Sequence, residues 1–208
     1  MSHNKTYLIT GANRGIGKAL LKTYLSHPST TVIAAVRTPD SPSTLNLQSL
    51  PTGPNSNLII VKIDSNSETD AKAAITHLQT EHGIKKLDVV IANAGIASYN
   101  KSGETSPEQM REHFAINTIG PLVLFQACLP LLLPSGSSNS TSSESHTGET
   151  EQKGIFTAIS SLVGSISSMG GLPLQSTAYG SSKAALNYVV RKIHFEYPDI
   201  CAFVINPG

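Results

Sequence analysis

Short runs of β-branched and other apolar residues alternate along the chain with longer stretches in which apolar residues recur every three or four positions. The first pattern predicts buried strands and the second predicts amphipathic helices. We expect strands at residues 7–10, 31–36, 58–63, 87–92, 154–159 and 200–205. We expect helices at residues 15–26, 68–82, 107–133 and 178–197. Alternation of strand and helix is typical of βαβ units, so the sequence predicts an α/β fold with a parallel sheet.

The third expected helix has a clear start. Ser106 is a natural N-cap, Pro107 suits the first helical position, and Gln109 can complete a capping box. Pro121 and Pro130 lie inside the same apolar pattern, and an internal proline removes a backbone hydrogen bond. We therefore expect this helix to be kinked or to end before Pro130.

Two stretches, residues 38–57 and 134–153, are rich in small and polar residues and are expected to be loops. The second could link two domains, but the strand expected directly after it completes the same sheet. We therefore expect residues 1–208 to form a single domain, with residues 134–153 as a low-complexity surface loop.

The composition, with 39% hydrophobic and 14% charged residues, is typical of a globular protein. A net charge of +1 gives no reason to expect nucleic acid or an acidic membrane as a partner. No apolar run approaches the roughly 18 residues of a transmembrane helix, and the N-terminus lacks a secretory apolar region. Cys128 and Cys201 lie in apolar contexts and are expected to be buried thiols, not a disulfide or a metal site. These features favour a cytoplasmic protein.

The sequence LITGANRGIGKAL places Gly11, Gly15 and Gly17 between the first strand and the first helix. Glycines there allow a tight turn that approaches a pyrophosphate, and the helix N-terminus offers unpaired N–H groups to the anion. The pattern predicts a dinucleotide-binding turn that also includes Arg14 and Ile16. A purely structural glycine turn is the alternative.

The end of the second strand distinguishes between the two nicotinamide dinucleotides. An NAD site requires an acidic residue there to bind the ribose 2′-hydroxyl, but this chain has Val36 followed by Arg37. Arg14 and Arg37 together can bind the 2′-phosphate of NADP(H) through bidentate hydrogen bonds. The sequence therefore favours NADP(H), and the alternative is that Arg37 is a solvated surface charge.

Four residues at strand ends are candidate contacts to the adenosine half of this cofactor. Asp64 follows the third strand and can accept a hydrogen bond from the adenine amino group. Asn93, Ala94 and Gly95 follow the fourth strand, where small residues let the adenosine lie against the backbone. Taken singly, each of these residues is more often an ordinary loop residue with no role in cofactor binding.

The last expected helix begins with Tyr179 and Lys183, which lie four positions apart and therefore on one helix face. A neighbouring ammonium favours the phenolate and so helps a phenol to exchange protons near neutral pH. Seen alone, such a pair on an amphipathic helix is usually structural. Combined with the glycine turn and the upstream serine pair, it predicts catalysis.

Six motifs follow one another along the whole chain: TGANRGIG, NAG at residues 93–95, AINTIGP around Asn117, ISS at residues 159–161, YGSSK at residues 179–183 and NPG at the end. In this order they resemble the short-chain dehydrogenase/reductase family. The resemblance implies a Rossmann-type three-layer sandwich around a doubly wound parallel sheet of strand order 3-2-1-4-5-6. Residues 66–94 and 179–196 are similar to the fungal norsolorinic acid ketoreductases and their relatives, which implies reduction of a ketone on an aromatic polyketide.

The resemblance also implies a role for each residue of the chemical site. Tyr179 donates a proton to the ketone oxygen as hydride arrives from NADPH, and Lys183 holds the ribose hydroxyls of the nicotinamide. Ser161 hydrogen-bonds the same ketone oxygen and stabilises its developing charge. Asn117 supports a water-linked proton relay to the lysine.

The interval from Ser161 to Tyr179 is longer than is common in the family, so other serines compete with Ser161 for its role. These competitors are Ser160, Ser165, Ser167 and Ser168. We favour Ser161 because it directly follows the expected strand.

The family continues beyond Pro207 and Gly208, which are themselves expected to contact the cofactor. We therefore expect the final strand of the sheet to be missing and the chain to fold marginally and turn over poorly. The leading hypothesis is an NADPH-dependent ketoreductase with a hydrophobic, aromatic small-molecule ketone as its substrate. The alternatives are a non-catalytic or truncated NADP(H)-binding relative and a dehydrogenase that uses NAD. By resemblance, a dimer or tetramer forms through the helices near Pro107 and Ala178.

Overall fold

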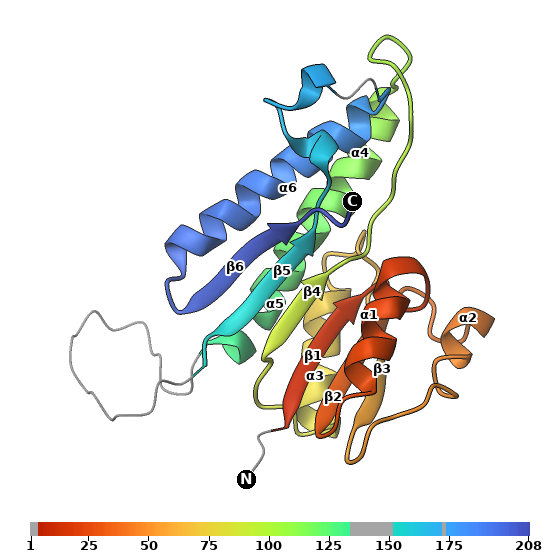
Figure 1. The fold of residues 1–208 in the computed structure, drawn as a ribbon, viewed down its shortest axis with the longest axis vertical. Coiled ribbons are helices and arrows are strands. Elements are labelled where there is room, and N and C mark those ends of the chain that lie inside the picture. The colour runs from red at the N-terminus through yellow and green to blue at the C-terminus, as the bar shows by residue number, and fades with distance from the viewer. Residues whose placement is uncertain (1–3, 134–151, 172–173) are drawn as a thin grey trace.

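The computed structural model describes residues 4–133, 152–171 and 174–208. In this part of the chain, six parallel strands form one sheet of order β3-β2-β1-β4-β5-β6, as predicted (Figure 1). The strands are β1 (Lys5–Thr10), β2 (Thr30–Val36), β3 (Asn57–Lys62), β4 (Val89–Ala92), β5 (Gly154–Ile159) and β6 (Ile200–Ile205). Because all strands are parallel, their carboxyl ends meet at one edge of the sheet.

The helices pack on the two faces of this sheet (Figure 1). They are α1 (Gly15–Leu25), α2 (Pro42–Leu45), α3 (Asp70–Glu81), α4 (Pro107–Phe114), α5 (Gly120–Leu132) and α6 (Thr177–Glu196). Helices α3, α5 and α6 bury one sheet face, and α1 lies on the other. Short 3₁₀ turns, η2 (Leu162–Gly164) and η3 (Met169–Gly171), follow β5. The predicted loop at residues 38–57 contains the single helical turn α2, which the sequence analysis missed.

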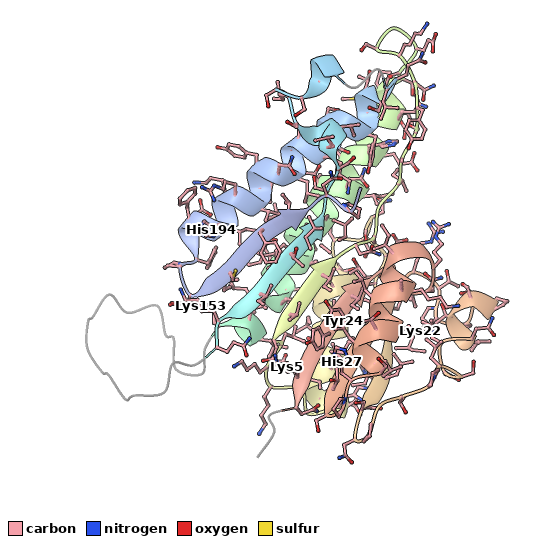
Figure 2. All side chains as sticks on the ribbon, viewed as in Figure 1. Lys5, Lys22, Tyr24, His27, Lys153 and His194 are labelled. Atoms are coloured by element: carbon pink, nitrogen blue, oxygen red, sulfur yellow. The ribbon has the colours of Figure 1, made fainter. Side chains whose placement is uncertain are left out.

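Alternate residues of the central strands supply the two cores. Leu8 belongs to the core beneath α3, α5 and α6, whereas the adjacent Ile9 packs beneath α1. Tyr24 of α1, which Figure 2 labels, also stacks on Tyr7 of β1. Their ring centroids lie 4.2 Å apart. Every residue of β2 is buried, as expected for a central parallel strand.

Helix α1 covers only part of its face of the sheet. Beside it, an apolar hollow of about 380 Å³ lies over β4, β5 and β6. Phe203 and Ile205 of β6 line this hollow and are 41% and 38% exposed. Thr157 of β5 lines it as well, and its buried hydroxyl has no hydrogen-bond partner among the described residues. In the described chain, the helix layer on this face is therefore complete over one half of the sheet only.

The helix expected at residues 107–133 is interrupted by a π-helical turn, η1 (Ala115–Ile119), between α4 and α5. The predicted capping box at Ser106 and Gln109 is confirmed. Of the two outcomes expected for this helix, a kink or an end before Pro130, the second does not occur, because α5 continues to Leu132. The wider turn ends two residues before Pro121, whose missing N–H cannot donate an α-helical hydrogen bond.

Two expectations from composition also need correction. Among the described residues, the continuous helical stretch Pro107–Leu132 is long and apolar enough to cross a membrane, although half of its 18-residue window is buried in the protein.

Cys128 is buried, as predicted, and burial raises the pKa of its thiol. Cys201 is exposed instead, because on β6 it alternates with Ile200 and Ala202, which face the helix-covered core.

Other boundaries differ from the prediction by a few residues. The expected strand at residues 87–92 begins only at Val89, because the Leu87 N–H bonds to the Leu131 carbonyl instead of a strand. Almost all of the expected surface loop at residues 134–153 lies outside the described residues. Lys153, at its end, donates a 2.7 Å hydrogen bond to the Pro198 carbonyl.

Candidate active site

The glycine turn between β1 and α1 lies at the carboxyl edge of the sheet. Gly11 and Gly15 have φ values of +64° and +52°, a conformation that strongly favours glycine. A Cβ on Gly17 would collide with the carbonyl of Gly11, so the turn folds tightly against the start of α1. A Cβ on Gly15 would meet nothing within 4 Å, so its backbone is open to a neighbouring group. This geometry fits a phosphate bound at a helix N-terminus.

Asn93 holds this turn against β4. Its Nδ2 donates to the carbonyls of Thr10 and Gly11, at 2.9 and 3.4 Å. The backbone N–H groups of Asn93 and Ala94 each donate to Thr10 Oγ1 at 3.0 Å. The Asn93 side chain therefore shapes the turn. Thr10, which sequence reasoning missed, is the residue that precedes the first glycine of the motif.

The two arginines predicted to bind the 2′-phosphate follow β1 and β2. Arg14 is the N-cap residue of α1, and Arg37 directly follows Val36 at the end of β2. Both side chains are exposed, and neither forms an ion pair with a described residue. Two exposed guanidinium groups beside a glycine turn fit the phosphates of NADP(H).

Asp64 lies beyond β3 and is half-buried. Its carboxylate accepts a 3.0 Å hydrogen bond from the Asn66 N–H, and its own N–H donates to the Asp70 carboxylate. This second bond is the main reason why the pKa of Asp70 lies below its usual value. One Asp64 oxygen therefore stabilises the local turn.

The predicted catalytic residues Tyr179 and Lys183 lie on one face of α6. The Lys183 Nζ is 5.7 Å from the centroid of the Tyr179 ring. Lys183 is only 4% exposed, and its ammonium donates a 2.7 Å hydrogen bond to the Ile159 carbonyl. Burial lowers the pKa of Lys183 to about 8, because a charge is costly in an apolar surrounding.

Ser161 lies two residues beyond the end of β5, is half-buried, and makes no side-chain hydrogen bond with a described residue. Its competitors are engaged elsewhere. The Ser160 hydroxyl donates to Asn187 Oδ1 at 2.6 Å. Ser165 hydrogen-bonds Ser168 at 3.0 Å and Ser167 at 3.2 Å. An uncommitted hydroxyl next to the strand is consistent with the role predicted for Ser161.

Two glycines bring the segment after Ser161 against α6. A Cβ on Gly164 would lie 2.9 Å from the Lys183 Cβ, and a Cβ on Gly180 would lie 3.0 Å from the Val163 carbonyl oxygen. Neither position has room for a side chain. The serine segment therefore lies against the helix at the level of the tyrosine and lysine.

Asn117 is fully buried and projects from the π-helical turn. Its Oδ1 accepts from the Ile96 N–H, and its Nδ2 donates to the Ile96 carbonyl and to Ser182 Oγ, at 2.9 to 3.0 Å. A Cβ on Gly95 would lie 3.0 Å from Asn117 Oδ1 and 3.7 Å from Lys183 Nζ. Gly95 thus lies near Lys183, whereas the sequence suggested that it contacts the adenosine half of the cofactor. Sequence reasoning missed Ser182, which lies within the YGSSK motif.

Ile16 and Pro207 come together at the apolar hollow over β4 to β6, which both residues line. Gly208 follows, with a φ of +101°. The structure therefore places these predicted cofactor contacts beside the start of α1. They lie at the same carboxyl edge of the sheet as Tyr179.

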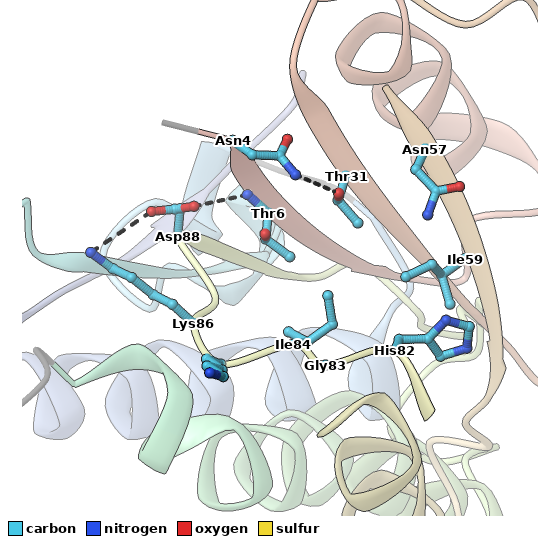
Figure 3. A pocket seen from close by; sticks show the side chains of 11 residues that line it. Asn4, Thr6, Thr31, Asn57, Ile59, His82, Gly83, Ile84, Lys86 and Asp88 are labelled. Atoms are coloured by element: carbon cyan, nitrogen blue, oxygen red, sulfur yellow. Dashed lines mark hydrogen bonds and ion pairs between the residues drawn. The ribbon is translucent and has the colours of Figure 1, made fainter. Parts of the chain in front are cut away.

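A second, polar hollow of about 380 Å³ lies at the opposite end of the sheet (Figure 3). There Asn4 donates to Thr31, and Asp88 accepts from the Thr6 N–H and pairs with Lys86. None of the predicted site residues lines it. In the described part of the chain, no group of three or more histidine, cysteine or acidic side chains is arranged to hold a metal ion.

The sequence model of the family described as short chain dehydrogenase matches residues 5–208. The chain belongs to this family. This short-chain dehydrogenase is 40% identical to the norsolorinic acid ketoreductase of Aspergillus parasiticus, over 97% of this chain and 69% of that protein. It is 41% identical to the norsolorinic acid ketoreductase of Dothistroma septosporum, over 100% of this chain and 72% of the relative.

Solved structures agree with the fold of this short-chain dehydrogenase. The NADPH-bound carbonyl reductase from chicken fatty liver is 31% identical, with a TM-score of 0.84 over 100% of this chain and 77% of that one. An alcohol dehydrogenase from Thermococcus sibiricus is 23% identical, with a TM-score of 0.77 over 98% and 76% of the two chains, and shows likeness of fold alone.

Proposed function

We propose that this short-chain dehydrogenase uses NADPH to reduce a ketone of a hydrophobic, aromatic, polyketide-like compound to an alcohol. The observation that carries the proposal is the pairing of Tyr179 with the buried ammonium of Lys183 on one face of α6. A buried lysine is costly, so a fold retains it where its charge has a function. The relatives named norsolorinic acid ketoreductase support the ketone as the substrate class.

The cofactor assignment rests on residues of this chain. The open turn at Gly15 and the N-terminus of α1 would bind the pyrophosphate, and Arg14 and Arg37 would bind the 2′-phosphate. When bound, NADPH supplies the hydride. The NADPH in the carbonyl reductase from chicken fatty liver supports this choice over NAD, as does the absence of an acidic residue after Val36.

The side chains supply the proton and the charge stabilisation. The Tyr179 hydroxyl donates its proton to the ketone oxygen, so that one proton and one hydride give the alcohol. Lys183 stabilises the phenolate that remains. Ser161 donates a hydrogen bond to the same oxygen as negative charge develops on it. Asn117 holds the backbone at Ile96 beside the lysine, where a water could return a proton.

Apolar side chains on two segments at this edge support a hydrophobic substrate. Tyr99, on the segment after β4, is 65% exposed, and Ile166, on the segment after β5, is 76% exposed. Leu174, just before α6, is also exposed. The Thr177 N–H donates to the Asn100 carbonyl at 3.4 Å, which joins the segment after β4 to the start of α6. These side chains can cover an aromatic ring system.

The test is a turnover assay that follows NADPH oxidation with norsolorinic acid and with a model aromatic ketone. We expect NADPH-dependent reduction, with little activity when NADH replaces NADPH. Tight NADPH binding in a titration without turnover of any ketone would instead favour a non-catalytic NADP(H)-binding protein.

We also propose a homodimer or homotetramer. Helix α6 exposes Tyr188 and Phe195 at 70% and 65% on its outer side, and the Arg191 guanidinium lies over the Phe195 ring at 4.4 Å. Light scattering should show a mass at least twice that of one chain. A monomeric mass at micromolar concentration would contradict this.

A further inference from the structure

We infer that Asn187 is a positioning residue for the reaction proposed above, which acts through Ser161. Asn187 lies on α6, one turn after Lys183. Its Oδ1 accepts a 2.6 Å hydrogen bond from the Ser160 hydroxyl, and its Nδ2 donates a 3.3 Å hydrogen bond to the Gly164 carbonyl. These partners lie on either side of Ser161 in the chain. One side chain therefore brackets the residue predicted to bind the ketone oxygen.

The orientation of the Asn187 amide follows from its partners. The Gly164 carbonyl can only accept a hydrogen bond, so the nitrogen of the amide must face it. The oxygen must then face Ser160, whose hydroxyl can donate. Both ends of the amide are satisfied, which leaves one side-chain conformation in which both bonds form.

The backbone transmits this constraint to Ser161. Ser161 is extended, with φ −156° and ψ 152°, and in extended chain successive side chains point to opposite sides. Ser160 is 4% exposed and directs its hydroxyl to α6, so Ser161 directs its hydroxyl away from the bond to Asn187. The Gly164 N–H closes the turn by donating to the Ser161 carbonyl at 3.0 Å. The Ser161 hydroxyl is thus positioned through bonds to the backbone and side chains on either side of it, and not through a bond to the hydroxyl itself.

Lys183 and Asn187 work from the same face of α6. Lys183 donates to the carbonyl of Ile159, two residues before Ser161, and Asn187 binds Ser160 and Gly164. The helix that carries the predicted proton donor therefore fixes the position of residues 159–164, which include Ser161. Small displacements of a group that binds the reacting atom are costly to catalysis.

The test is a double-mutant cycle with Asn187→Ala and Ser161→Ala in the full chain, assayed with NADPH and a saturating ketone. We expect Asn187→Ala to lower kcat by about 10-fold, with NADPH affinity unchanged. In the Ser161→Ala background the same substitution should change kcat by less than about twofold, because the residue it positions is already gone. A purely structural role would lower kcat by the same factor in both backgrounds.

Two further variants complete the design. Ser160→Ala removes one of the two bonds and should lower kcat in the same direction, even if Asn187→Ala fails to fold. Lys192→Ala, on the exposed side of α6, is the matched control and should leave kcat unchanged. Equal effects in both backgrounds, or a wild-type kcat in Ser160→Ala, would overturn the inference alone. A wild-type chain that turns over no ketone would overturn the proposed function, and the inference with it.

Discussion

The Lys183 ammonium donates a 2.7 Å hydrogen bond to the Ile159 carbonyl and thereby joins the N-terminal part of α6 to the end of β5. The bond partly compensates for the burial of a positive charge that forms no ion pair with a described residue. The fold therefore contains a group that is unfavourable for stability and favourable for the proposed chemistry.

Lys183→Met should abolish ketone reduction and raise thermal stability at pH 7. Burial lowers the pKa of Lys183 from 10.5 to about 8, which corresponds to a cost on the order of 3 kcal/mol for the protonated side chain. Differential scanning calorimetry should show a melting temperature several degrees above that of the wild type. Lys192→Met, at an exposed ion pair, is the control and should change little.

The stability gain should depend on pH in one direction. Below pH 8 both folded and unfolded chains hold the proton, so the wild type carries the full cost. Between pH 8 and 10.5 the unfolded chain binds more protons, so wild-type stability rises with pH and the advantage of Lys183→Met shrinks. A melting temperature below that of the wild type at pH 7 would contradict this account.

The rate of ketone reduction should fall as the pH rises through about 8. The cause is loss of the Lys183 charge that stabilises the phenolate of Tyr179. A pH profile of kcat/KM under NADPH saturation measures this. In a Lys183→Arg variant that retains activity, the fall should move to higher pH, since arginine stays charged. If the pH profile of Lys183→Arg matches that of the wild type, the group that titrates is not Lys183.

Tyr179→Phe should lower kcat by at least about 100-fold and leave NADPH affinity largely intact, because it removes the proton donor and keeps the ring. Stopped-flow single-turnover measurements and a fluorescence titration separate the two effects. Tyr188→Phe is the matched control, since Tyr188 is 70% exposed on the same helix. Weakened binding with unchanged turnover would contradict the role given to Tyr179.

Arg37→Ala should weaken NADPH binding by about 10- to 100-fold and leave NADH binding nearly unchanged. The guanidinium is exposed, and a charge-assisted bond to a phosphate is worth a few kcal/mol at most. Isothermal titration with both cofactors measures the difference. Arg111→Ala, at an exposed ion pair on α4, should affect neither. Equal losses for the two cofactors would show that Arg37 does not read the 2′-phosphate.

Much of the fold could be predicted from local patterns. The buried run of β2 is evident in its apolar residues. The strand order is not a local signal and was predicted only through the resemblance to the family. The capping box at Ser106 also uses residues close together in the sequence, so its spacing alone predicted it. Local signals of this kind do not depend on what the rest of the chain contributes.

The features that were missed depend on contacts between distant segments. The π-helical turn at Asn117 leaves the apolar periodicity of the helix nearly unchanged, and a Cβ on the adjacent Gly120 would clash with the Ser65 backbone. Ser182 and Asn187 lie on the buried side of α6 for reasons visible only when Asn117 and Ser160 are in place. Polar residues on a helix give no sequence signal for such partners.

Gly164→Ala should destabilise the fold by about 1–3 kcal/mol and lower kcat together, because its Cβ would lie 2.9 Å from the Lys183 Cβ. The added methyl group must push the η2 turn away from α6, and Ser161 lies at the start of that turn. Gly170→Ala, in the same segment, is the control, since a Cβ there meets nothing within 4 Å. Denaturant unfolding and a turnover assay on both variants measure the two effects. A Gly164→Ala variant as stable and active as Gly170→Ala would show that the serine segment tolerates displacement, and would contradict its close fit against the helix.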